Sequence, residues 1–121
     1  KIKQKRKEKG MIKSNCRYRF TATPEGLIVS VSGEIDHHSA LTMRRDVDNI
    51  IWNRTPTHLI LDMSEVDFMD SSGLGFIMGR YALMREIGGN LSLRDPSPVV
   101  MKMLTMTGFD KKVRISNTAK L

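Results

Sequence analysis

The sequence predicts an α/β fold, in which helices pack against a mostly parallel β-sheet with an antiparallel edge pair. Apolar side chains alternate in residues 17–23 and 27–33, on either side of a Pro-Glu-Gly turn signal, as in two adjacent strands. Three further apolar stretches (57–63, 91–93 and 113–115) are separated by segments with helical spacing. Strands joined through helices need crossover connections, which make neighbouring strands parallel.

The first pair of strands and the first helix follow from a change of period. The strand positions that would face the core are Tyr18, Phe20, Ala22, Leu27, Val29 and Val31. From residue 39 the apolar positions take helical spacing, at Ala40, Met43, Val47, Ile50 and Ile51. Ser39 is a candidate N-cap, and we expect the helix to end before Pro56 because the residue that precedes a proline avoids helical geometry.

The central strand and the second helix come next. Residues 57–63 contain the run Leu-Ile-Leu, which predicts a buried strand. The following helix would take Asp70 or Ser71 as its N-cap and end at the Gly-Gly pair of residues 88–89. We expect its buried stripe to be Leu74, Ile77, Met78, Tyr81 and Met84.

The last elements are shorter. A third helix would start at Pro96 or Pro98, between the strands at 91–93 and 113–115, and end near Gly108. Its inward side chains would be Val99, Met103 and Met106.

Composition limits the chain to one domain. Its 121 residues leave no room for a second core, and the single cysteine, Cys16, cannot form an internal disulfide, which favours a reducing compartment. No apolar run approaches the roughly 18 residues that a membrane span needs. We therefore expect a cytoplasmic protein that does not enter a membrane, with a monomer as the default state.

The net charge of +7 is concentrated at the N-terminus. Residues 1–19 carry nine basic and one acidic side chain, whereas residues 20–121 carry eleven basic and twelve acidic ones. We predict a basic, disordered extension over residues 1–16 and a folded domain over residues 17–121. Because the domain is nearly neutral, we expect no direct binding of nucleic acid. Met11 is an alternative start, which would make residues 1–10 an upstream segment.

Residues 68–75, with the sequence Phe-Met-Asp-Ser-Ser-Gly-Leu-Gly, place two hydroxyls and a carboxylate where a strand leaves the sheet and a helix begins. A phosphate on Ser71 would lie at the helix N-terminus, which accommodates anions, and would add about −1.5 to −2 charges. Ordinary helix capping explains the same residues, so their spacing alone does not decide between the two interpretations.

Enzyme interpretations lack support in the motifs. A Gly-x-Ser-x-Gly elbow and a phosphate-binding Gly-x-x-x-x-Gly-Lys-Ser/Thr loop are both missing. His37, His38 and His58 are candidate bases, but we expect the first two in a loop with Asp36, and no spacing ties any of them to Ser71. Adjacent histidines rarely bind one metal ion. We expect no catalytic residue, no metal and no enzymatic activity.

A second motif completes a resemblance to a known family. Residues 33–40 (Gly-Glu-Ile-Asp-His-His-Ser-Ala), taken with residues 68–75, resemble the STAS domain of anti-sigma factor antagonists, and most of all the anti-sigma F factor antagonists of spore-forming bacteria. The likeness continues through residues 79–81, 87–89 and 106–109 and covers residues 27–115. The chain differs from the family in its basic N-terminus and in ending soon after the last strand, without a clear C-terminal helix.

The resemblance implies a partner switch in transcription regulation. The unphosphorylated antagonist binds an anti-sigma factor that is itself a serine kinase, and so releases the sigma factor. The kinase uses its own ATP, so the antagonist needs no cofactor, and it phosphorylates the serine that matches Ser71, with Ser72 as the alternative. A phosphatase of the PP2C type restores binding. A dianion facing an acidic partner would weaken binding by about 2–4 kcal/mol, or roughly 30- to 1000-fold.

The same resemblance implies a docking surface formed by the two motifs. Its residues would be Gly33, Glu34, Asp36, His37, His38, Asp70, Ser71, Ser72 and Gly73. The alternative is a scaffold STAS domain that binds a regulatory partner constitutively, without phosphorylation.

Overall fold

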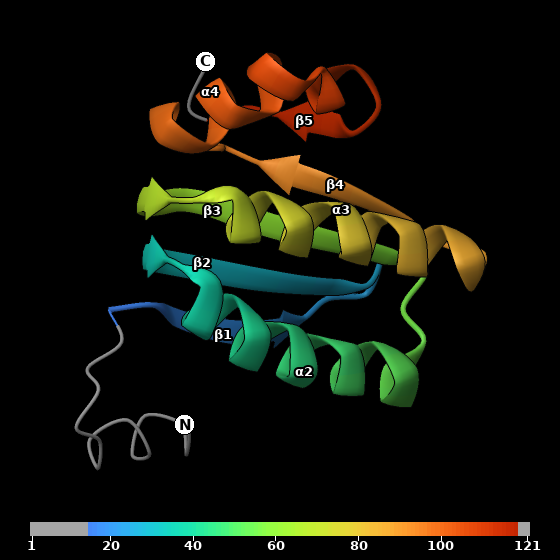
Figure 1. The fold of residues 1–121 in the computed structure, drawn as a ribbon. Coiled ribbons are helices and arrows are strands. Elements are labelled where there is room, and N and C mark those ends of the chain that lie inside the picture. The colour runs from blue at the N-terminus through green and yellow to red at the C-terminus, as the bar shows by residue number, and fades with distance from the viewer. Residues whose placement is uncertain (1–14, 119–121) are drawn as a thin grey trace, which may run out of the picture.

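The computed structural model describes residues 15–118, which form a five-stranded sheet with the order β1-β2-β3-β4-β5 (Figure 1). The antiparallel pair β1–β2 and the parallel pairs that follow confirm the predicted fold class. The elements are β1 (Arg17–Ala22), β2 (Leu27–Ile35), α2 (His37–Arg54), β3 (His58–Met69), α3 (Ser71–Glu86), β4 (Asn90–Arg94), α4 (Pro98–Thr107), the 3₁₀ helix η1 (Phe109–Lys111) and β5 (Arg114–Ser116).

Helices α2 and α3 lie side by side over one face of the sheet (Figure 1). The strand side chains beneath them are buried and form the core: Leu27, Val29, Val31, Leu59, Leu61, Met63, Leu91 and Leu93. Cys16, assigned to the extension by the sequence analysis, is also buried in this core. The rest of the predicted extension, residues 1–14, lies outside the described residues. None of the helices within residues 15–118 combines the length and hydropathy that a bilayer span requires.

Strand β3 is longer than predicted and ends at Met69 instead of residue 63. The apolar run that marked the strand stops early, but β3 keeps pairing with β2 through two register shifts until Ile35 lies opposite Met69. Such irregularities change which face successive side chains occupy, so simple alternation could not show the continuation.

Helix α2 begins two residues earlier than the predicted cap. Asp36 is the N-cap, whereas Ser39 is the third helical residue and completes a capping box with it. His37 and His38 therefore lie in the first turn of α2, not in a loop. The helix ends before Pro56 as predicted, with Thr55 in the left-handed region.

Two predicted apolar stripes were partly wrong. Met78 on α3 is 42% exposed, whereas Phe76 and Arg80 are buried, because α3 packs against α2 as well as the sheet. In α4 the buried residues are Val100 and Leu104, and Met106 is 72% exposed.

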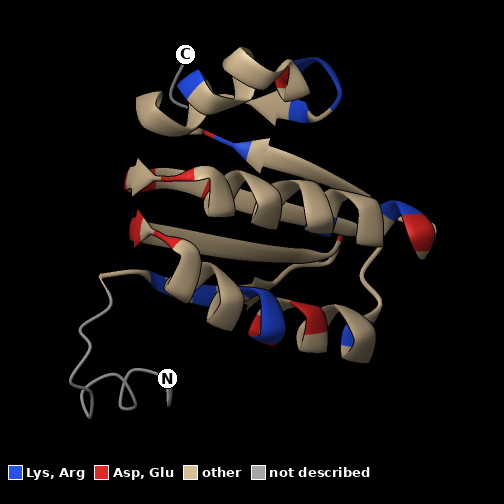
Figure 2. Cartoon of the chain, in the orientation of Figure 1, with Lys and Arg blue, Asp and Glu red and all other residues tan. Residues whose placement is uncertain are grey.

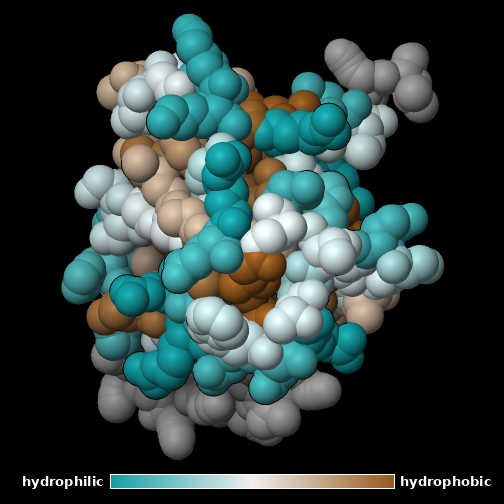
Figure 3. Space-filling model, turned by 90° about the vertical axis from the view of Figure 1, so that its right-hand side faces the viewer, coloured by the Kyte–Doolittle hydropathy of each residue, from teal (hydrophilic) through white to brown (hydrophobic). Residues whose placement is uncertain are grey.

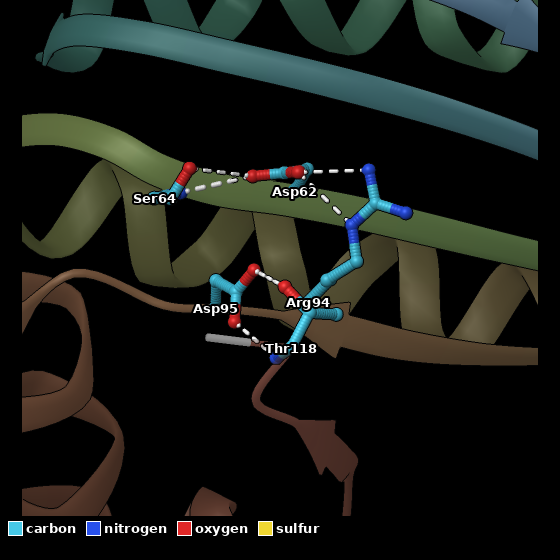
Figure 4. Close-up of polar contacts among 5 residues, drawn as sticks. All are labelled: Asp62, Ser64, Arg94, Asp95 and Thr118. Carbon is cyan, nitrogen blue, oxygen red and sulfur yellow. Dashed lines mark hydrogen bonds and ion pairs between the residues drawn. The ribbon is translucent and has the colours of Figure 1, made fainter. Parts of the chain in front are cut away.

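Polar contacts fix the C-terminal side of the sheet (Figure 4). Asp62 on β3 accepts hydrogen bonds from the backbone and hydroxyl of Ser64 and pairs with the Arg94 guanidinium on β4, at 2.9–3.0 Å. Asp95, just after β4, accepts from the backbone N–H and the hydroxyl of Thr118. These contacts fasten the segment after β5 to the end of β4.

Candidate functional site

The two motifs meet where β2 and β3 end. Ile35 and Met69 are paired across the strands, and the Asp70 N–H donates to the Ile35 carbonyl at 3.2 Å. Each strand leads directly into a helix, α2 after Asp36 and α3 after Asp70. The nine residues predicted to form a docking surface thus lie at one edge of the sheet, the edge where open α/β sheets generally place their sites.

Asp36 fixes the start of α2. The Ser39 N–H donates to Asp36 Oδ1 at 2.9 Å, and the Asp36 N–H donates to Ser39 Oγ at 3.0 Å. The hydrogen bond from the Ser39 backbone lowers the pKa of the Asp36 carboxyl, more than its slight burial raises it. Asp36 is therefore an ionised cap on an exposed side chain.

Asp70 fixes the start of α3 in a similar way. The Ser72 N–H donates to Asp70 Oδ1 at 2.8 Å, and the Gly73 N–H donates to the Asp70 carbonyl at 3.0 Å. Ser71 is the first helical residue and is exposed. Ser72 is half-buried, and its Oγ lies 3.5 Å from His37 Nδ1 on α2. The two serine side chains therefore differ in their exposure to solvent, although they are adjacent in the sequence.

Two glycines permit this close junction. A Cβ on Gly73 would lie 2.2 Å from Met69 Cγ and 3.1 Å from Ile35 Cγ2, so only glycine lets α3 start this near the ends of both strands. Gly33 has a φ of +91°, and a Cβ there would lie 1.7 Å from the Asn15 carbonyl oxygen. Both glycines predicted to form the docking surface thus have a structural role.

The edge is acidic and carries one exposed aromatic ring. Acidic segments mark the ends of β2 and β3 in Figure 2, where Glu34, Asp36 and Asp67 are exposed. Phe68 is 48% exposed and pairs with Glu34 across the strands. The opposite end of the molecule, drawn in Figure 3, shows hydrophilic side chains around a small apolar area.

Phe68 and Asp67 were not among the predicted site residues. The sequence signal for Phe68 was its place in the motif, but an aromatic residue in a strand is more often buried. The register shifts of β2 and β3 turn it outward.

A groove of about 370 Å³ continues from this edge between α2 and α3. His37 and Ser72 line its start, and the remaining lining residues are Ala40, Leu41, Arg44, Gly75, Phe76, Gly79 and Arg80. None of these seven was predicted as a site residue, because the groove exists only once the two helices are packed together.

The histidines do not form a catalytic arrangement with Ser71. His58, at the start of β3, has its Nε2 3.0 Å from Ser92 Oγ, and His37 approaches Ser72 instead. Within residues 15–118, no group of three or more His, Cys, Asp or Glu side chains is placed to hold a metal ion.

Comparison with known proteins assigns the fold and its paired motifs to a family. The sequence model of the STAS domain family matches residues 17–120. The chain belongs to the STAS domain family. A curated relative of this STAS domain, the anti-sigma F factor antagonist of Paenibacillus polymyxa, is 44% identical over 85 residues, which are 70% of this chain and 73% of that protein.

Solved structures agree with this assignment. The anti-sigma factor antagonist SpoIIAA in its unphosphorylated form has a TM-score of 0.75 and 25% identity, over 86% of this chain and 90% of that one. The Bacillus cell fate determinant SpoIIAA in its phosphorylated form has a TM-score of 0.71 and 26% identity, over 86% of this chain and 93% of that one.

Proposed function

We propose that this STAS domain is an anti-sigma factor antagonist whose unphosphorylated form binds an anti-sigma factor serine kinase and releases the sigma factor. The observation that carries the proposal is an exposed serine, Ser71, at the first position of α3 in the middle of the edge that unites both motifs. The names of the Paenibacillus relative and of SpoIIAA support the antagonist function, and SpoIIAA has a phosphorylated form.

The difference between the two serines favours Ser71 as the phosphorylated residue. A kinase must bring the γ-phosphate of ATP in line with the accepting hydroxyl, which requires open space around it. Ser71 offers that space, whereas Ser72 is half-buried at the entrance to the groove beside His37. A PP2C-type phosphatase would need the same access to remove the phosphate.

The acidic edge bears on how phosphorylation of Ser71 would weaken binding of the partner. The resemblance implied an acidic partner surface, but Ser71 follows Asp70 at an edge that also carries the exposed side chains of Glu34 and Asp36, and complementarity favours a basic partner. The phosphate would then weaken binding through its bulk and through the water lost from a dianion at a contact shaped for a hydroxyl.

The proposed switch assigns ATP to the kinase and no cofactor to this chain. We place the antagonist in the cytoplasm, as a monomer that regulates transcription during sporulation without touching nucleic acid itself.

Intact-mass spectrometry tests the proposal. The full chain and its Ser71→Ala and Ser72→Ala variants would be incubated with ATP and the anti-sigma F factor of Paenibacillus polymyxa. We expect a single added phosphate in the wild type and in Ser72→Ala, and none in Ser71→Ala. A stable complex with no added phosphate would instead support the constitutive scaffold.

A further inference from the structure

Two glycines of α3 are not explained by packing among residues 15–118. Within that part of the chain, a Cβ added to Gly75 or Gly79 would meet no atom within 4 Å, in contrast to the tight surroundings of Gly73. Glycine inside a helix destabilises it relative to alanine, and these two positions lie four residues apart on one face. Both line the groove between α2 and α3. Their small size therefore leaves room for something outside the described domain.

A buried cation lies in the same groove. The Arg80 side chain is only 7% exposed; its Nε lies 2.8 Å from Asp48 Oδ1, and its Nη1 lies 3.4 Å from the Phe76 carbonyl oxygen. A guanidinium with so little exposure depends on nearby acceptors to offset the water that it has lost.

The charge of the groove indicates which kind of ligand it favours. Arg44 also lines the groove, and its Nε lies 3.8 Å from Asp48. One carboxylate thus serves two guanidinium groups, which leaves the groove with a net positive charge. Leu41, which is 47% exposed, adds an apolar contact beside them.

We infer that the groove receives a segment of the anti-sigma factor that carries a carboxylate side chain. The backbone of that segment would lie against Gly75 and Gly79, and its carboxylate would pair with Arg80 and Arg44. Because His37 and Ser72 belong to both the edge and the groove, one partner can cover both surfaces at once. The inference rests on the proposed function and extends the docking surface along α3.

Binding measurements with glycine variants test this inference. The probe is the anti-sigma F factor of Paenibacillus polymyxa, titrated calorimetrically with the full unphosphorylated chain. Gly79→Gln should fill the groove and weaken binding at least tenfold, without lowering Tm. Ala82→Gln is the matched control, because Ala82 is exposed on α3 but does not line the groove; its Kd should stay within twofold of the wild type. Arg44→Gln should weaken binding severalfold and reduce its dependence on salt.

The outcomes separate the inference from the proposed function. If the wild type binds and Gly79→Gln binds equally well, the groove is not a docking site, although the antagonist function stands. Equal weakening in Gly79→Gln and Ala82→Gln would also overturn the inference, because the effect would not be specific to the groove. If the wild type fails to bind, both the proposed function and the inference are wrong.

Discussion

Alanine substitutions at Gly73 and Gly75 should change stability in opposite directions, although the two glycines are two residues apart in one helix. At Gly75 the added methyl meets no atom of the described residues within 4 Å, so only the helix propensity changes. We expect Gly75→Ala to stabilise the domain by about 0.5–1 kcal/mol. The gain arises mainly because alanine loses less backbone entropy than glycine on folding.

At Gly73 the same gain is outweighed by overlap. The methyl would lie 2.2 Å from Met69 Cγ and 2.7 Å from Met69 Sδ, well inside the usual contact of about 3.5–4 Å between carbon atoms. Met69 is buried and cannot move into solvent. Overpacking of this kind costs about 1–3 kcal/mol, so Gly73→Ala should be less stable than Gly75→Ala by about that amount.

Urea unfolding followed by circular dichroism measures both variants against the wild type. Unchanged m-values would show that the unfolding transitions are comparable. Equal stability of the two variants would refute the packing argument at the β3–α3 junction. A Gly75→Ala variant less stable than the wild type would refute the claim that this position is open.

Four further predictions concern the helix caps and the buried ion pair. Asp36→Ala should lose about 0.5–2 kcal/mol of stability in the same urea assay, because the capping box is broken. The pKa of Asp36 is lowered in the folded state. The stability that its carboxylate contributes is therefore complete at a pH above 3.8, the pKa of the unfolded carboxyl, and is lost as the pH falls through the lower pKa of the folded state. The stability advantage over Asp36→Asn should therefore shrink in unfolding curves taken below pH 3.8, and a constant difference would contradict the assignment. Asp70→Asn should keep the fold, since asparagine also caps helices, but slow phosphorylation of Ser71; normal incorporation of phosphate would show that the carboxylate charge is not needed. Asp48→Ala should destabilise the domain by about 3–5 kcal/mol, because it removes the one carboxylate that pairs with the buried Arg80 within residues 15–118. A loss near that of an exposed pair, below about 1 kcal/mol, would show that water reaches this charge.

Elements with a regular period were predictable from the sequence, whereas their ends were not. The early start of α2 depended on which of two polar residues, Asp36 or Ser39, became the N-cap, since both residue types suit that position. The length of β3 depended on its pairing with β2, which no local pattern of β3 contains. Exposure of Met106 likewise depended on how α4 is rotated against the sheet.

The sequence by itself determined the fold class, the two motifs and the serine at the start of α3, because periodicity and turn residues act over a few neighbouring positions. Only the tertiary structure decided which side chains around Ser71 are accessible. Tertiary packing turned Phe68 outward and left Ser72 half-buried beside His37. It also formed the groove that Gly75 and Gly79 line. Such features depend on contacts between β2, β3, α2 and α3, elements separated along the chain, and a local pattern carries no information on how they pack.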